Sequence, residues 1–281
     1  MEEDPRRLCG QVPSRRVGHM SAWTSEIAGK VGIATFNRPP RNFMSFEALG
    51  DLSGILKELA ARSDVSIIIL ASANEKYFVS HADLDDLEQV ASGKPVAGER
   101  SAWRTTPALI EAIPQPVIAA VNGQAWGGGT ELALACSVRV AAPAATFGLP
   151  EISVGMVPGA GGTQRLSRLI GTGRALELIL SGRKVSAEEA FRMGLVNAIL
   201  PNRNFRQAVM DWAQQFARHD FDALVANKRA VTEGVRLDFE AGLDLERSLV
   251  IPRTASPRSV ELRTLLMKRY AAASPDDEID F

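Results

Sequence analysis

The chain has 281 residues, of which 46% are hydrophobic and 23% charged, the balance of a globular protein with a full core. Its net charge of −1 excludes a general attraction to nucleic acid or to an anionic membrane surface, and no apolar run reaches the roughly 20 residues that span a bilayer. Two cysteines, Cys9 and Cys136, are too few for a disulfide framework, so we expect a reducing compartment, the cytoplasm.

The first half of the chain predicts strands that alternate with helices. Residues 1–22 are polar, arginine-rich and aperiodic, which predicts a disordered extension, and the first twenty contain no apolar segment typical of a secretory leader. From Ser25, two short strands around a Gly29-Lys30 turn predict a hairpin that ends at Phe36. The elements predicted after it are a helix over 46–62 capped by Ser45, a buried strand over 65–70, a short helix near Leu84, a helix over 101–113, strands over 117–121 and 138–142 with a compact helix over 131–136 between them, and a helix from about 162.

Helical patterns dominate from Ser186 onward. The sequence Ser186-Ala187-Glu188-Glu189 is a capping box that opens a short helix, and Gly194 ends that helix. Strands that alternate with helices in the earlier part indicate parallel βαβ units. We therefore predict an α/β fold with a core over 23–200 and a helical C-terminal region over 201–281. The longer helices of that region are predicted over 205–218, 222–233, 239–249 and 259–272.

The stretch over 117–136 joins a predicted strand to a helix through glycines. The glycines at 127–129 precede a helix with Glu131 in its first turn. Such a turn presents unpaired backbone N–H groups and lets a substrate approach closely. Because the lysine and hydroxyl of a phosphate-binding loop are missing, the carboxylate favours acyl chemistry, in which the N–H groups hold an oxyanion and Glu131 moves protons. The alternative is an ordinary glycine-rich turn.

Three stretches together resemble the crotonase family of enoyl-CoA hydratases and isomerases. They are VNGQAWGGGTELALAC at 121–136, YFVSHADLDDL at 77–87 and FGLPEISVGMVPGAGGTQRL at 147–166, and the similarity runs in order from about Ile33 to Met267. The resemblance implies a ββα spiral core, a helical C-terminal region for subunit contacts and the CoA pocket, and a homotrimer or dimer of trimers. It also implies an acyl-CoA thioester substrate, with coenzyme A as part of that substrate and no prosthetic group. No metal-ligand spacing is present in the sequence.

The resemblance also assigns the reacting groups. In the family two backbone N–H groups hold the thioester oxygen, and here they are expected from Ser80 and Gly128. The two family glutamates correspond to Glu131, expected to orient and deprotonate the attacking water, and Glu151, expected to give a proton to the α-carbon. The alternatives are that Glu131 only interacts with the helix dipole and that Glu151 is a solvated loop acid. The presence of both acids favours hydration over isomerisation, for which the resemblance implies that the Glu151-type acid suffices.

Other residues are expected to bind the substrate. His81 stands where the family usually has glycine, so it predicts either a second acid or base, as in a carbon–carbon hydrolase, or a position that only donates backbone hydrogen bonds; we favour the latter. Trp126 stands where the family often has leucine. It is expected either to line the acyl pocket or to pack in the core, and we favour core packing. The remaining candidates are Ala82, Asp83 (also expected to cap the following helix), Leu84, Arg38, and Lys268 with Arg269, for which a solvated basic helix face is the alternative.

We therefore predict an enzyme that adds water across the double bond of a trans-2-enoyl-CoA, with no nucleic-acid or membrane partner. A same-fold isomerase or β-diketone hydrolase is the first alternative. A non-catalytic acyl-CoA-binding protein is an alternative from a different class.

Overall fold

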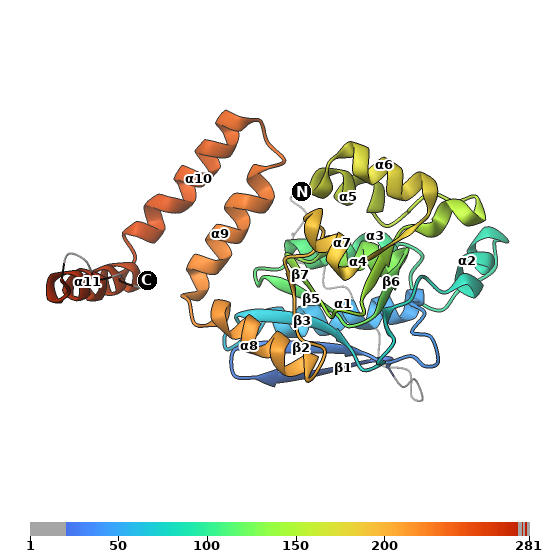
Figure 1. Ribbon diagram of the computed structural model, residues 1–281, viewed down its shortest axis with the longest axis horizontal. Coiled ribbons are helices and arrows are strands. Elements are labelled where there is room, and N and C mark those ends of the chain that lie inside the picture. Colours follow the sequence, from blue (N-terminus) through green and yellow to red (C-terminus); the bar gives the residue numbers. More distant parts are fainter. Residues whose placement is uncertain (1–20, 275–276, 278, 280–281) are drawn as a thin grey trace, which may run out of the picture.

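The computed structural model describes residues 21–274, 277 and 279, so residues 1–20 of the predicted extension lie outside the described residues. Within the described part of the chain the strands form two sheets, one of six strands and one of four. The first sheet has the order β1-β2-β3-β5-β7-β10 and the second the order β4-β6-β8-β9. Helices surround both sheets, and the C-terminal helices lie to one side of them (Figure 1).

The first sheet opens with the predicted hairpin and continues in parallel. β1 (Trp23–Ala28) and β2 (Val31–Phe36) pair antiparallel, with Trp23 opposite Phe36. The strands β2, β3 and β5 are buried on both faces over most of their length, which is typical of a parallel sheet covered on both sides. The parallel neighbours that follow β2 are β3 (Ile67–Ser72), β5 (Val117–Val121), β7 (Val138–Ala141) and β10 (Ala198–Ile199).

The second sheet takes its strands in alternation with the first. β3 is followed by β4, β5 by β6, and β7 by β8, so each turn of the chain places one strand in each sheet before the next helix. This arrangement is the ββα spiral that the resemblance implies. The second sheet consists of β4 (Tyr77–Val79), β6 (Gln124–Trp126) and β8 (Thr146–Gly148) in parallel, with β9 (Lys184–Ser186) antiparallel to β8.

Several helices begin at the predicted capping residues. The Ser45 hydroxyl accepts from the Ala48 N–H at the start of α1, and Ser186 accepts from the Glu189 N–H at the start of α7. The helices are α1 (Phe46–Ala60), α2 (Leu84–Ala91), α3 (Ala102–Ala112), α4 (Gly128–Ala135), α5 (Gly162–Ile170), α6 (Thr172–Ser181), α7 (Ala187–Arg192), α8 (Phe205–Ala217), α9 (Phe221–Gly234), α10 (Phe239–Thr254) and α11 (Pro257–Ala272), with the 3₁₀ helix η1 (Pro150–Val154) before α5.

The hydrophobic core lies on both faces of the first sheet. Successive side chains of a strand point to opposite faces. One face therefore packs with α1 and α4, and the other packs against α8. Because α8 belongs to this core, the packing extends to Ala217 and passes the boundary that we predicted at residue 200.

Beyond α8, the helices α9, α10 and α11 extend away from the sheets (Figure 1). No residue of these three helices is buried. Lys228 holds α9 to the core, because its Nζ donates to the carbonyl oxygens of Ile113 (2.7 Å) and Gln115 (3.0 Å). None of the helices in the described residues combines the length and the apolar character that crossing a bilayer requires. Large exposed apolar side chains along the three helices include Val231, Phe239, Leu243, Val250, Ile251, Val260, Leu265 and Met267.

Candidate active site

The glycine turn between β6 and α4 leaves the first backbone N–H groups of α4 without an acceptor among the described residues. Gly127 has φ +50° and its N–H donates to the Gly148 carbonyl oxygen (2.8 Å). The N–H of Gly128, the first residue of α4, has no acceptor among the described residues. A Cβ at Gly128 would collide with the Trp103 ring, and one at Gly129 would collide with the Val79 carbonyl oxygen. The helix N-terminus can therefore approach β4 and α3 this closely only because these positions are glycine.

The segment from Ser80 to Asp83 corrects one prediction. The Ser80 N–H, expected to face the substrate, already donates to the Asn42 carbonyl oxygen (3.1 Å), so the assignment of Ser80 as a free donor is wrong. The Ser80 side chain is also occupied, since its Oγ accepts from Gln124 Nε2 (2.8 Å). The N–H groups of His81 and Ala82 have no acceptor in the described part of the chain.

The directions of the neighbouring carbonyls separate these two N–H groups. In a planar trans peptide the C=O and the next N–H point in opposite directions. The Ser80 carbonyl accepts from the Trp126 N–H (3.0 Å) in β6, so the His81 N–H points away from β6. The His81 carbonyl accepts from the Met44 N–H (2.9 Å), so the Ala82 N–H points away from Met44, toward the side on which β6 runs into the glycine turn. Ala82, and not Ser80, thus offers the second free N–H on the side of Gly128.

Glu131 is buried in the first part of α4 and is held by the start of α5. Its side chain is 3% exposed, and its Oε1 accepts from the backbone N–H groups of Ala160 (2.7 Å) and Gly162 (2.8 Å). Burial raises the pKa of Glu131, while the two N–H donors and the Arg165 charge act in the opposite direction. One oxygen of the Glu131 carboxylate is therefore fixed by the segment that begins α5. This contact goes beyond the alternative in which Glu131 only interacts with the dipole of its own helix.

Glu151 lies across the glycine turn from Glu131, in η1. Its Oε1 is close enough to Gly127 that a Cβ there would lie 2.9 Å from it, and its Oε2 is buried without a hydrogen-bond partner among the described residues. Burial, together with the nearby charge of Glu131, raises the pKa of Glu151 to about 7. The environment of the Glu151 carboxyl group therefore disagrees with the alternative of a solvated loop acid. A carboxyl group with this pKa can give or accept a proton at neutral pH.

The His81 ring is held by its own loop. It stacks on Phe43 with 4.3 Å between ring centroids, and its Nδ1 lies 2.6 Å from the Ala82 carbonyl oxygen. Because a carbonyl oxygen only accepts, Nδ1 carries the hydrogen. The described residues show no hydrogen bond from the imidazole to either glutamate. These contacts favour the alternative in which His81 is not a second acid or base, and its role stays a prediction.

Arg38 and Asp83 pair with each other and organise this loop. The guanidinium NH1 of Arg38 lies 2.5 Å from Asp83 Oδ2 and 2.9 Å from the Phe43 carbonyl oxygen. Asp83 also caps α2 as predicted, since it accepts from the Asp85 N–H (3.1 Å). Leu84 begins α2 and is 54% exposed. Arg38 is thus already paired with a carboxylate of the chain. Its expected contact with a CoA phosphate stays a prediction.

Neither the Trp126 ring nor Lys268 has a contact with the free N–H groups among the described residues. The Trp126 indole N–H donates to Thr146 Oγ1 (3.1 Å), and Lys184 Nζ lies 3.3 Å from the ring centroid. The ring therefore lies toward β8 and β9, which are on the opposite side of β6 from β4, and its place at an acyl pocket stays a prediction. Lys268 is on α11, which packs on α10 far from α4 within one chain (Figure 1).

Two residues at the site were not among the predicted site residues. Trp103 in the first turn of α3 places the edge of its ring against Gly128. Arg165, which we quoted only as part of the PGAGGTQRL stretch, donates through NH1 to the Ala160 carbonyl oxygen (2.7 Å) next to the donors that hold Glu131. An aromatic residue near a helix start and an arginine on a helix are too common in sequences to signal a site by themselves.

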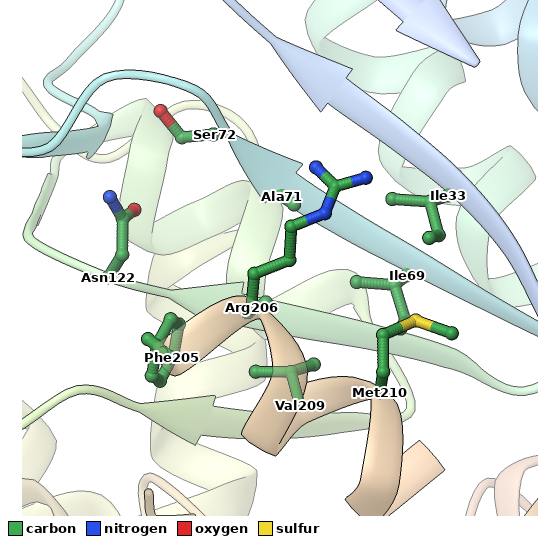
Figure 2. Close-up of a pocket in the computed structure, with 10 residues that line it drawn as sticks. Ile33, Ile69, Ala71, Ser72, Asn122, Phe205, Arg206, Val209 and Met210 are labelled. Atoms are coloured by element: carbon green, nitrogen blue, oxygen red, sulfur yellow. The ribbon is translucent and has the colours of Figure 1, made fainter. Parts of the chain in front are cut away.

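A separate cavity of about 50 Å³ lies on the other face of the first sheet (Figure 2). Figure 2 shows Ile33, Ile69, Val209 and Met210 lining it, with Arg206 from α8. The sheet separates this cavity from α4 and its glutamate. The described residues contain no group of three or more His, Cys, Asp or Glu side chains arranged to hold a metal ion.

Comparisons with known proteins agree on one family. The family model described as "Enoyl-CoA hydratase/isomerase" matches residues 26–262. The Short-chain-enoyl-CoA hydratase of Clostridium acetobutylicum is 36% identical over 226 residues, 79% of this chain and 85% of that protein. The 2,3-dehydroadipyl-CoA hydratase of Escherichia coli is 37% identical over 222 residues, 78% of this chain and 85% of that protein. The crystal structure of an enoyl-CoA hydratase from Bacillus anthracis superposes with a TM-score of 0.82 at 36% identity, covering 89% of this chain and 97% of that one.

Proposed function

The chain belongs to the enoyl-CoA hydratase/isomerase family, and on that premise we propose that it adds water across the double bond of a trans-2-enoyl-CoA. The observation that carries the proposal is the pair of glutamates, Glu131 buried and Glu151 half-buried, beside a glycine turn that also presents free backbone N–H groups. An isomerase of the same family needs only one such acid, so the pair supports hydration.

The free N–H groups of Gly128 and Ala82 are proposed to hold the thioester oxygen. Negative charge grows on this oxygen as the enolate forms, so fixed donors stabilise the transition state more than the substrate. Loss of one such donor typically costs about 3 kcal/mol of barrier. The Gly128 N–H is at the N-terminus of α4, where the helix dipole acts in the same direction.

The environments of the two glutamates divide the proton transfers. Glu131 Oε1 receives two N–H donors that favour the carboxylate, so Glu131 suits the base that takes a proton from the attacking water. Glu151, with its pKa raised to about 7 by burial, suits the acid that gives a proton to the α-carbon while the water oxygen bonds to the β-carbon. One turnover leaves Glu131 protonated and Glu151 ionised, so the proton must exchange between them or with solvent before the next.

The C-terminal helices are proposed to assemble copies of the chain into a homotrimer or a dimer of trimers. Their exposed apolar side chains, among them Phe239 and Val250, support an assembly because contiguous apolar surface marks an interaction site. Lys268 can then serve a CoA phosphate only across a subunit contact, since α11 lies away from its own α4. No prosthetic group is needed for this chemistry, and the low number of cysteines supports a cytoplasmic address.

The decisive test follows the absorbance of crotonyl-CoA with purified protein. We expect turnover, and a fall of at least about 100-fold in kcat for Glu131→Gln and for Glu151→Gln. Glu188→Gln, an exposed glutamate on α7, is the control and should retain full activity. Turnover that survives Glu131→Gln but not Glu151→Gln indicates isomerisation. Activity on a β-diketone that is lost only with His81→Ala indicates hydrolysis, and thioester binding without any turnover indicates a non-catalytic protein.

A further inference from the structure

The loop that holds Glu131 is itself held by an arginine. Ala160 and Gly162 donate to Glu131 Oε1, and between their N–H groups the Ala160 carbonyl oxygen accepts from Arg165 NH1 (2.7 Å). Gly161 has φ +99°, and the Arg165 guanidinium occupies the space where a side chain at Gly161 would lie. Arg165 therefore fixes the backbone whose N–H groups aim at the glutamate.

A carboxylate on α3 fixes that arginine in turn. Arg165 Nε lies 2.6 Å from Glu111 Oε1, and the two side chains are only 21% and 24% exposed. The second oxygen of Glu111 accepts from Arg236, which follows α9, at 2.9 Å. Although burial favours the neutral acid, the two arginines hold the pKa of Glu111 below its ordinary value. Glu111 thus stays ionised and joins α5 to the first residues after α9.

We infer that Arg165 and Glu111 are positioning residues for Glu131, and that Arg236 joins this chain of contacts to the C-terminal helices. The inference rests on the proposed function for its kinetic consequence. The contacts run without a gap from Arg236 to Glu111, from Glu111 to Arg165, from Arg165 to the Ala160 carbonyl, and from the Ala160 N–H to Glu131.

Two effects on Glu131 follow from these contacts. The first is geometric, since a carboxylate that loses its aimed N–H donors no longer fixes the direction of its free oxygen. The second is electrostatic, because the Arg165 charge favours the ionised form that acts as the base. The charged groups around Glu131 are Arg165 from α5 and Glu151 from η1, with Glu111 behind Arg165. Removing Arg165 therefore raises the pKa of Glu131.

The kinetic test compares Arg165→Gln, Arg165→Lys and Glu111→Gln with Arg168→Gln. Arg168 is three residues further on α5, is exposed and, among the described residues, bonds only to Gln164, so it is a matched control. For Arg165→Gln we expect kcat to fall by about tenfold or more, KM for crotonyl-CoA to change less than about twofold, and the acid limb of the pH profile of kcat to move to higher pH. In Arg165→Lys the lysine keeps the charge but cannot reach both Glu111 and Ala160. We therefore expect kcat to fall while the acid limb of its pH profile moves little. Glu111→Gln should give an intermediate loss, and Arg236→Gln the smallest.

A second measurement separates this inference from the proposed function. Infrared spectra of the substrate-free protein, minus those of Glu131→Gln, follow the Glu131 carboxyl band as a function of pH. We expect the band to persist to higher pH in Arg165→Gln and to be unchanged in Arg168→Gln. If wild-type protein does not hydrate crotonyl-CoA but the band moves as expected, the proposed function fails and the positioning of Glu131 stands. The inference is overturned if the band does not move. It is also overturned if the variants at Arg165, Glu111 and Arg236 all lose activity in proportion to their thermal stability.

Discussion

The spiral core and the three C-terminal helices differ in where their helices find partners. In the core, α1, α3, α4 and α5 each bury side chains against strands or other helices of the same chain. In α9, α10 and α11 no residue is buried, and Val235 after α9 and Phe239 at the start of α10 are 79% and 78% exposed. Because most of the stability of a helix comes from its packed face, the core can hold its reacting groups alone. The C-terminal helices leave most of their apolar side chains exposed in the single chain, as the proposed assembly requires.

Replacing a glycine by alanine should have the most different effects on stability in the core and in the C-terminal helices. Gly129→Ala drives a Cβ into the Val79 carbonyl oxygen, a backbone atom within the core, so we expect a loss of at least about 4 kcal/mol in the free energy of unfolding. A Cβ in Gly242→Ala, on α10, meets no atom nearer than the Gly234 carbonyl oxygen at 3.4 Å, so this variant should gain up to about 1 kcal/mol. Urea unfolding of both variants measures the two effects, and similar values would show that the core is no more tightly packed than α10.

A matched pair of phenylalanines gives the next largest effect. Phe147, at 1% exposure, packs in the core, and Phe147→Ala should cost about 3–5 kcal/mol of unfolding free energy. Phe239→Ala should change the stability of a single chain by less than about 0.5 kcal/mol, because that ring is 78% exposed among the described residues. We expect it instead to weaken self-association, measured by sedimentation at several protein concentrations. An unchanged association constant would mean that Phe239 is not part of an interface.

The strands and helices that the sequence predicts well have long or strongly patterned segments. The hairpin at Trp23–Phe36 and the buried run of β5 carry enough β-branched residues to be read directly. The strands β4, β6, β8 and β9 have three residues each, too few for a period to show, so local patterns did not predict them and only the family resemblance implied the spiral. The helix α4 begins at Gly128 and not at Glu131, because tertiary packing overrides the low helix propensity of glycine.

The candidate site shows the same limit at the level of single groups. Glu131 and Glu151 could be predicted from their motifs, but the pKa of Glu151 depends on burial by residues distant in sequence. Ser80 was the wrong donor because the direction of an N–H depends on the peptide planes around it, and these follow from the contacts of Asn42 and Met44 with the loop. The ring of Trp103 reaches Gly128 through the packing of α3, which no local pattern encodes.

The stability of the core should depend on pH, because the ionised form of Glu151 weakens the fold that holds it. Its pKa of about 7 lies above the ordinary 4.5, so the folded state holds this proton more tightly than the unfolded state. The free energy of unfolding should therefore fall as the pH rises from about 4.5 to about 7, by about 1 kcal/mol after allowance for the partly exposed carboxyl. Glu151→Gln should remove this fall, as measured by urea unfolding across the range. A variant with the same slope as wild type would contradict the buried environment of Glu151.

The smallest effect is expected where the two regions meet, at Lys228. Burial lowers the pKa of its ammonium from 10.5 to about 8, so the folded state releases this proton more readily than the unfolded state. The contribution of Lys228 to the free energy of unfolding should therefore rise with pH between about 8 and about 10.5, by less than about 1 kcal/mol.

Lys228→Met removes both this titration and the contacts to Ile113 and Gln115, so the difference from wild type should grow across that window. Arg229→Met, at the exposed neighbour that pairs with Glu233, should show a constant difference. Amide hydrogen exchange should quicken in α9 of Lys228→Met while α4 keeps its protection, because the core holds α4 without the help of α9. Exchange that quickens equally in both helices would show that the core and the C-terminal helices unfold as one unit.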